Sequence, residues 1–220
     1  LIAETGGMNA MIVDSSALTE QVVVDVLASA FDSAGQRCSA LRVLCLQDEI
    51  ADHTLKMLRG AMAECRMGNP GRLTTDIGPV IDSEAKANIE RHIQTMRSKG
   101  RPVFQAVREN SEDAREWQSG TFVAPTLIEL DDFAELQKEV FGPVLHVVRY
   151  NRNQLPELIE QINASGYGLT LGVHTRIDET IAQVTGSAHV GNLYVNRNMV
   201  GAVVGVQPFG GEGLSGTGPK

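Results

Sequence analysis

Short apolar runs alternate with amphipathic helical patterns along almost the whole of this 220-residue chain. Apolar residues recur at helical spacing in five stretches, which predict helices over residues 19–34, 49–65, 83–99, 154–163 and 178–188. The apolar runs between them predict strands over residues 41–46, 102–107, 122–130, 144–150, 169–175 and 192–195. Strands that alternate with helices of this length need crossover connections. The sequence therefore predicts an α/β fold, with a mostly parallel sheet and helices on both faces.

Local signals support some of these boundaries. Ser and Thr residues just before the first helix are predicted to cap it, because their side chains can accept hydrogen bonds from its unpaired N–H groups. Gly100 is predicted to end the helix over residues 83–99. The charged residues 109–116 are predicted to form a loop between two strands.

At roughly 100–200 residues per domain, the length of the chain corresponds to one domain or one and a half.

Charge and composition argue against several classes of protein. The chain has 19 Lys and Arg against 27 Asp and Glu, a net charge of -8, and no basic stripe, so nucleic-acid binding is not expected. No apolar run approaches the roughly 20 residues that span a bilayer, so no integral membrane segment is expected. The three cysteines and the lack of a recognisable export signal favour a reducing, cytoplasmic location.

The two ends of the sequence suggest that it is part of a longer chain. The chain begins at Leu1 without an initiator Met, and it stops at Lys220 inside a glycine-rich segment. Natural domains usually end in exposed polar segments. We therefore expect an excised piece of a longer protein.

Cys38 is a candidate catalytic side chain. It lies in the polar, glycine-containing sequence SAGQRCS, residues 33–39, between the first helix and the first strong strand. Ligands of α/β proteins gather at strand edges, and a thiolate is a good nucleophile. An unselected cysteine is more often a small buried hydrophobe, but polar neighbours on both sides weaken that interpretation. Cys45, inside an apolar strand, is predicted to pack in the core, and Cys65 has no evident role.

Two carboxylates are candidates to act beside this cysteine. Glu4 precedes a glycine pair that lets the backbone turn tightly, so it could present a base towards a cleft; a solvated strand terminus is the simpler interpretation. Glu139 lies two residues before Phe141 and could bind a polar, flat ligand together with that ring. It could equally be a surface charge at the end of a helix. These residues alone do not decide between the alternatives.

The glycine-rich tail and the histidines give weaker signals. The sequence GEGLSG, residues 211–216, formally matches the dinucleotide pattern G-x-G-x-x-G, but that motif must follow a strand and open a helix. A loop that wraps a small ligand with backbone N–H groups is predicted instead. The five histidines lack metal-ligand spacing and no C-x-x-C occurs, so no metal site is predicted.

Four short motifs in a fixed order are much more specific than any one of them. They are ETGG at residues 4–7, GQRC at residues 35–38, EVFGP at residues 139–143 and PFGG at residues 208–211. Together they resemble the signature of the aldehyde dehydrogenase superfamily. The tail, GAVVG at residues 201–205 followed by FGGEGLSGTGPK, is most similar to the L-glutamate-γ-semialdehyde (1-pyrroline-5-carboxylate) dehydrogenase domain of bifunctional bacterial flavoenzymes of proline catabolism.

The resemblance implies a role for each matching position. Cys38 would attack the aldehyde to give a thiohemiacetal, hydride would leave to NAD⁺ to give a thioester, and Glu4 would activate the hydrolytic water. Glu139 would hydrogen-bond the nicotinamide ribose, with Phe141 packed beside it. Four further residues would bind the substrate, three through its α-carboxylate and the last through its aliphatic part: Ser39, Gly201, Ala202 and Phe209.

The same resemblance implies what lies outside this chain. Residues 1–220 would form the cysteine-bearing catalytic domain of a longer enzyme, ending in a substrate-anchoring loop at residues 201–220. The family's dinucleotide-binding domain, the Asn of its oxyanion hole and its oligomerisation flap are absent from the sequence. The implied partners are the amino-acid semialdehyde and the missing dinucleotide-binding domain. FAD is expected only in an absent proline dehydrogenase domain, and the longer enzyme is expected to be a homo-oligomer.

Two other classes of function fit the residues themselves. A cysteine hydrolase or acyltransferase would use Cys38 with a histidine within hydrogen-bond reach, and it would not need NAD⁺. A non-catalytic interaction module would keep only the fold. The distance between Cys38 and the histidines tests the first of these, and the effect of replacing Cys38 tests the second.

We expect the isolated chain to bind NAD⁺ weakly and not to turn over, because the family's phosphate-holding glycine loop is missing from it. Isothermal titration calorimetry of the 220-residue chain with NAD⁺ measures this directly. A micromolar dissociation constant for the isolated chain would contradict the prediction.

Overall fold

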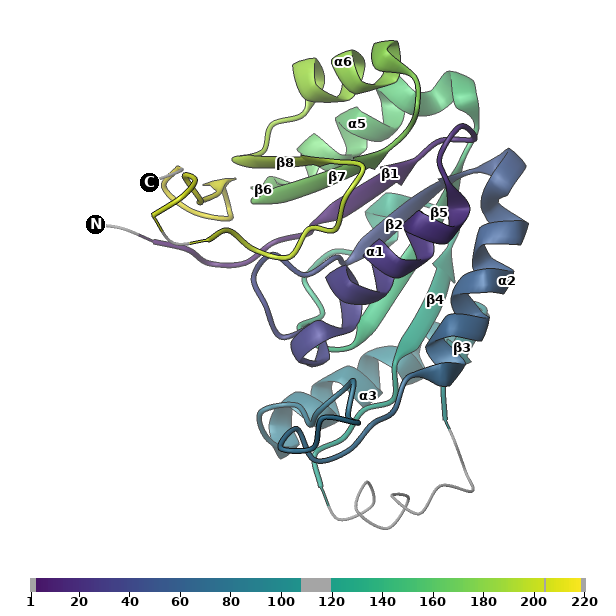
Figure 1. The fold of residues 1–220 in the computed structure, drawn as a ribbon, viewed down its shortest axis with the longest axis vertical. Helices are drawn as coiled ribbons and strands as arrows, with labels where there is room; N and C mark the ends of the chain where they lie inside the picture. Colours follow the sequence, from purple (N-terminus) through teal and green to yellow (C-terminus); the bar gives the residue numbers. More distant parts are fainter. Residues whose placement is uncertain (1–2, 108–119, 204, 219–220) are drawn as a thin grey trace.

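One sheet of seven strands forms the centre of the computed structural model, which describes residues 3–107, 120–203 and 205–218 (Figure 1). In pairing order the strands are β3 (Val103–Gln105), β4 (Thr126–Leu130), β5 (Val144–Tyr150), β2 (Val43–Gln47), β1 (Ala10–Val13), β7 (Thr170–His174) and β8 (Asn192–Val195). All neighbouring strands run parallel except β3 and β4. A separate antiparallel pair joins β6 (Tyr167–Gly168) to β9 (Glu212–Gly213). The predicted α/β fold is confirmed.

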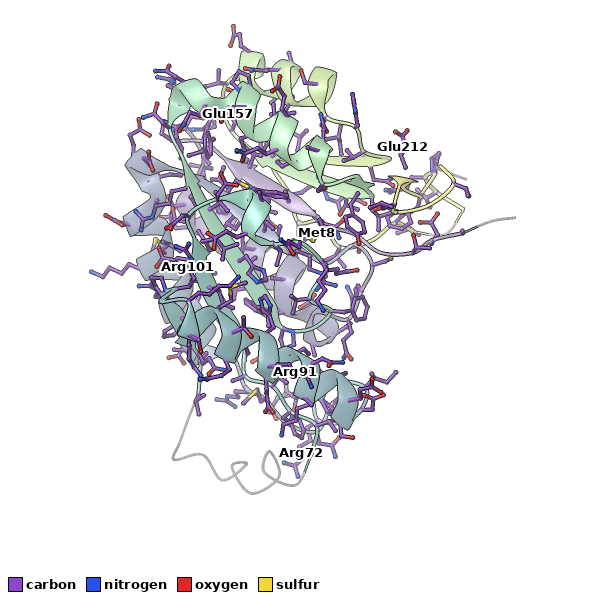
Figure 2. The ribbon with its side chains drawn as sticks, turned by 180° about the vertical axis from the view of Figure 1, so that it is seen from behind. Met8, Arg72, Arg91, Arg101, Glu157 and Glu212 are labelled. Atoms are coloured by element: carbon purple, nitrogen blue, oxygen red, sulfur yellow. The ribbon has the colours of Figure 1, made fainter. Side chains whose placement is uncertain are left out.

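Helices cover both faces of this sheet. The helices of the described residues are α1 (Thr19–Phe31), α2 (Asp48–Glu64), α3 (Ser83–Ser98), α5 (Leu155–Ala164) and α6 (Asp178–Ser187). α1 and α2 lie in front of the sheet in Figure 1, and α3 and α5 come to the front in the reverse view of Figure 2. Every residue of β1, β2 and β7 is buried, as expected for strands with helices on both faces. No helix in the described part of the chain is long and apolar enough to cross a membrane.

The start and end of α1 differ from the prediction. Leu18 occupies the N-cap position and no side chain makes a capping hydrogen bond, so the predicted Ser and Thr caps are wrong. The helix ends at Phe31 rather than at residue 34, because Ser33 and Ala34 adopt the left-handed conformation, with φ of 56° and 54°. These two residues belong to a short 3₁₀ turn, Asp32–Gly35, that leads into the segment with Cys38.

The other predicted boundaries agree closely with the structure, but the sequence does not predict the strands β1, β6 and β9. Gly100 lies just after the C-terminal end of α3 and has φ of 78°, so the predicted glycine stop of this helix is confirmed. β1 is central to the sheet, but the sequence does not predict it, because four residues are too few to show a period. The predicted loop at residues 109–116 lies outside the described residues, as do the chain ends at Leu1 and Lys220.

The parallel sheet brings the four motifs to one edge. Residues 4–7, 35–38 and 139–143 precede β1, β2 and β5, which are neighbours, so these three loops meet at the amino edge of the sheet. The segment after β8 returns to the same edge, where Asn192, the first residue of β8, donates from Nδ2 to the Pro208 carbonyl at 2.9 Å. Ligands of open α/β sheets usually bind at the opposite, carboxyl edge.

Candidate active site

The turn that carries Cys38 is exposed and firmly held. The Cys38 side chain is open to solvent, whereas Cys45 is buried in β2, where burial raises the pKa of its thiol to about 12. Asn9, itself buried, donates from Nδ2 to the carbonyls of Cys38 at 2.7 Å and Ala40 at 2.8 Å. Its Oδ1 accepts from the Thr170 N–H at 3.2 Å. Asn9 therefore fixes the backbone of the cysteine turn to β7, and of the two cysteines only Cys38 is placed to react.

A cavity of about 600 Å³ opens beside Cys38. Its described lining includes five of the predicted site residues together with one cation: Cys38, Ser39, Gly201, Ala202, Phe209 and Arg37. The described lining holds no carboxylate. The cavity therefore suits a ligand that carries a negative charge near the thiol.

Hydrogen bonds within the cavity wall determine which donors face a ligand. The Gly201 N–H is already used, since it donates to Ser39 Oγ at 3.2 Å and to the Met199 carbonyl at 3.0 Å. The Ser39 hydroxyl keeps its own proton to donate. The Ala202 N–H has no hydrogen-bond partner among the residues that the structure describes. Of the three residues predicted to bind the carboxylate, Ser39 and Ala202 thus keep a donor unused, and Gly201 contributes the shape of the turn.

Arg42, which the sequence analysis missed, is the buried centre of this edge. Its side chain is 0% exposed, and its Nε and Nη2 donate to Glu139 Oε1 at 3.0 and 2.9 Å. Nη1 donates to the Gly35 carbonyl at 2.7 Å, and Nη2 also donates to the Arg37 carbonyl at 3.1 Å. Burial lowers the pKa of the guanidinium, and the Glu139 carboxylate opposes that shift. The signal that the sequence offers is a charged residue near the start of an apolar strand. This signal does not identify the residues that the arginine contacts.

Glu139 and Phe141 both contact the side chain of Arg42. Glu139 Oε2 accepts from the Gly7 N–H at 3.2 Å, so its carboxylate also joins the first motif to the third. The Phe141 ring is 46% exposed, and the Arg42 guanidinium lies 5.0 Å from its centroid. A carboxylate edge and an open aromatic face are therefore presented side by side. Neither residue is among the described lining of the cavity at Cys38.

Glu4 is placed apart from the cysteine. It pairs with Gly216 in an isolated antiparallel bridge, and a Cβ on Gly216 would lie 3.1 Å from Glu4 Oε2. Glu4 is exposed and does not belong to the described lining of the cavity. The glycine-rich residues 211–216, predicted to wrap a ligand, pair with β6 and with the segment around Glu4, and the ligand-binding role stays a prediction.

The histidines are engaged elsewhere. His92 and His146 face each other with their Nε2 atoms 2.9 Å apart, and His146 Nδ1 lies 3.2 Å from the Arg42 carbonyl. Burial lowers the pKa of His146 to about 3. His174 Nε2 lies 3.4 Å from Asp25 Oδ2. None of the histidines lines the cavity at Cys38, and the described residues contain no group of three metal-ligating side chains.

Comparison with known proteins gives consistent matches over the whole chain. The model of the aldehyde dehydrogenase family matches residues 1–220. The bifunctional protein PutA of Salmonella typhimurium (strain LT2) is 94% identical over all 220 residues. A crystal structure of bifunctional proline utilization A (PutA) matches with a TM-score of 0.92 and 52% identity. A 1-pyrroline-5-carboxylate dehydrogenase from Thermus, crystallised with bound NAD, matches with a TM-score of 0.86 and 37% identity.

The chain covers only part of each of these proteins. It spans 17% of the Salmonella protein. The matches to the two structures include 100% and 98% of this chain, and 22% and 40% of the chains that it matches.

Replacing Arg42 by Met should destabilise the chain by about 3 kcal/mol, because the Glu139 carboxylate and several buried carbonyls lose their donor. Urea unfolding followed by circular dichroism measures the change. Arg91→Met, which removes an exposed arginine bonded to Asn88 at 2.8 Å, is the matched control and should change stability by less than about 0.5 kcal/mol. Equal stability of the two variants would contradict the central role given to Arg42.

Proposed function

Because the chain belongs to the aldehyde dehydrogenase family, we propose that it carries the cysteine-bearing half of the active site of an NAD-dependent L-glutamate-γ-semialdehyde dehydrogenase. The reaction would oxidise the semialdehyde to L-glutamate, the second step of proline catabolism. The supporting observation is the cavity at Cys38, where an exposed thiol, two free donors and one cation surround a space of about 600 Å³. The names of the matching proteins, proline utilization A and 1-pyrroline-5-carboxylate dehydrogenase, point to the same substrate.

Cys38 is the proposed nucleophile. Its Sγ would form a bond to the aldehyde carbon, giving a thiohemiacetal on the cysteine. Loss of hydride from that carbon leaves a thioester, and water then releases the carboxylate product and the free thiol. The Asn9 hydrogen bonds to the Cys38 and Ala40 carbonyls support this role, since they hold the turn so that the thiol faces the cavity without rearrangement.

The α-carboxylate of the substrate would be held by other residues that line the cavity. The Ser39 hydroxyl and the Ala202 N–H can donate to its α-carboxylate, and Gly201 shapes the turn between them. Phe209 would cover the aliphatic part, and the Arg37 cation adds a favourable potential for an anion. An aldehyde without a carboxylate would leave these donors unpaired and would be a poorer substrate.

Glu4 is the proposed general base for thioester hydrolysis. Its carboxylate now lies against Gly216, so it would have to turn towards the cavity to reach a water beside Cys38. Catalytic contacts are often made only after substrate is bound. Glu4 is exposed, so its side chain can change rotamer without disturbing buried groups.

The fit of this chain to NAD is limited to the nicotinamide half. Glu139 Oε2 keeps a lone pair after accepting from Gly7, and it could accept a ribose hydroxyl. The open face of Phe141 offers a surface for a flat ring. When bound, NAD⁺ would supply the hydride acceptor. No glycine loop that opens a helix is present in the described ranges to hold the phosphates, so a further domain would bind the rest of the cofactor.

The chain is accordingly proposed to be the catalytic domain of a longer, cytoplasmic enzyme. That enzyme would add a dinucleotide-binding domain, with FAD confined to a separate proline dehydrogenase domain, and would assemble as a homo-oligomer. This proposal is supported by the small part of the length of the matching proteins that the chain covers.

The rival cysteine hydrolase lacks its partner in this structure. Such an enzyme needs a histidine at hydrogen-bond distance from the thiol. His92, His146 and His174 have other neighbours, and no histidine is among the described residues that line the cavity. The non-catalytic module is tested by replacing Cys38.

Cys38→Ser should lower aldehyde oxidation by at least about a thousandfold in a protein that joins this chain to the family's dinucleotide-binding domain. NADH formation with L-glutamate γ-semialdehyde measures the rate. Cys65→Ser, at the end of α2, is the matched control and should keep full activity. Unchanged turnover in the Cys38 variant would overturn the proposed function.

Glu4→Gln should separate the two halves of the reaction. Without the base, the thioester forms but hydrolyses slowly, so a rapid burst of about one NADH per active site should precede a steady rate about a hundredfold lower. Stopped-flow absorbance with excess substrate resolves the burst. A uniform loss of burst and steady rate would assign Glu4 a role before the thioester instead.

A further inference from the structure

Tyr194 is a buried residue of β8 that the proposed mechanism does not use. Its side chain is 4% exposed, and its hydroxyl donates to the Gly201 carbonyl at 3.0 Å. Gly201 lines the cavity at Cys38. The hydroxyl of a strand residue thus reaches the loop that is proposed to hold the substrate carboxylate.

The geometry of the peptide bond extends this contact into the cavity. The Gly201 carbonyl and the Ala202 N–H belong to one planar trans peptide group, in which the two bonds point in opposite directions. No cis peptide occurs among the described residues. Because Tyr194 holds the carbonyl on one side of the C–N bond, the Ala202 N–H points to the opposite side of that bond within the same plane, and Ala202 lines the cavity.

The other side of the turn is fixed as well. Gly201 has φ of 51°, a left-handed conformation that suits glycine, and its N–H donates to Ser39 Oγ and to the Met199 carbonyl. The carbonyl held by Tyr194 adds a restraint on the tilt of the Gly201–Ala202 peptide plane. Ser39 and Tyr194 together orient the turn.

The surroundings of Tyr194 keep its hydroxyl a donor. Burial raises the pKa of the phenol, the positive charge of Arg197 opposes that shift, and the charge of a Cys38 thiolate adds to it. The Arg197 guanidinium lies 5.2 Å from the ring centroid and is itself held by donation from Nε to the Asn198 carbonyl at 3.1 Å. The ring is thus packed in place and the hydroxyl keeps its proton at neutral pH.

We propose that Tyr194 is a positioning residue that sets specificity for aldehydes bearing a distal carboxylate, by aiming the Ala202 N–H into the cavity. The proposal rests on the proposed function of the cavity at Cys38. It assigns to a buried hydroxyl that bonds the Gly201 carbonyl the preorganisation of the Ala202 donor in the same peptide group. A purely structural hydroxyl would contribute to folding and would leave the choice between substrates unchanged.

The test is Tyr194→Phe, which removes only the hydroxyl, in the protein that joins this chain to the dinucleotide-binding domain. The values of kcat/KM are measured for L-glutamate γ-semialdehyde and for butanal, which has no carboxylate. The ratio of the first value to the second should fall about fivefold, through a higher KM for the semialdehyde, because one orienting hydrogen bond is lost.

Tyr150→Phe provides the matched control. Tyr150 is also buried, and its hydroxyl also donates to a backbone carbonyl, that of Val13, at 3.2 Å, but it ends β5 at the carboxyl edge of the sheet. This variant should keep the specificity ratio of the unsubstituted protein. A ratio unchanged by Tyr194→Phe, or lowered equally by Tyr150→Phe, would overturn the proposal. The activity of the unsubstituted protein and its loss in Cys38→Ser report on the proposed function separately.

Discussion

A single buried guanidinium organises the edge of the sheet where the four motifs meet. Arg42 is fully buried immediately before β2, and its donors join the Glu139 carboxylate to the carbonyls of Gly35 and Arg37. Taking a charge out of water is costly unless its partners are well placed, and here most of its hydrogen-bonding positions are used. The loop before β2 and the loop before β5 therefore cannot move independently. Glu139 extends the connection to the loop before β1 through the Gly7 N–H.

This polar centre explains how an exposed cysteine can be held in a defined position. The backbone on the N-terminal side of Cys38 is bound to Arg42, and the Cys38 carbonyl itself is bound to Asn9. The approach of the loops is close enough to require glycine at one point, because a Cβ on Gly35 would lie 2.2 Å from the Gly142 carbonyl and Gly35 has φ of 66°. The thiol is thus presented by a rigid support, which is the condition for efficient attack on a bound carbonyl.

The sequence predicts those features whose cause is local. β5 and β8 agree with the prediction to the residue, because each is an apolar run with clear boundaries, whereas β1 is too short to show a pattern. The grouping of Cys38 with the residues of the anchoring loop came from a resemblance and not from spacing. Arg42 and Asn9 could not be found in this way, since their function lies in contacts with partners far along the chain, 97 residues away for Arg42 and Glu139. The position of Glu4 likewise depends on pairing with the distant tail.

The groups at the carboxyl edge of the sheet explain why the cavity lies at the amino edge. The direction of the crossovers changes between β1 and β7, and open α/β sheets usually bind ligands at the carboxyl ends of such strands. Here that position is filled by the protein's own groups: Asp14 accepts from the Ser16 N–H at 2.8 Å and from the Thr175 hydroxyl, and Ser16 Oγ accepts from the Arg176 N–H at 2.7 Å. Because these groups already hydrogen-bond to one another, few donors and acceptors remain there for a ligand. At the amino edge, by contrast, the Cys38 thiol is exposed and Cys38 and Ala202 line an open cavity, so this edge keeps groups that the hydrogen bonds of the fold have not used.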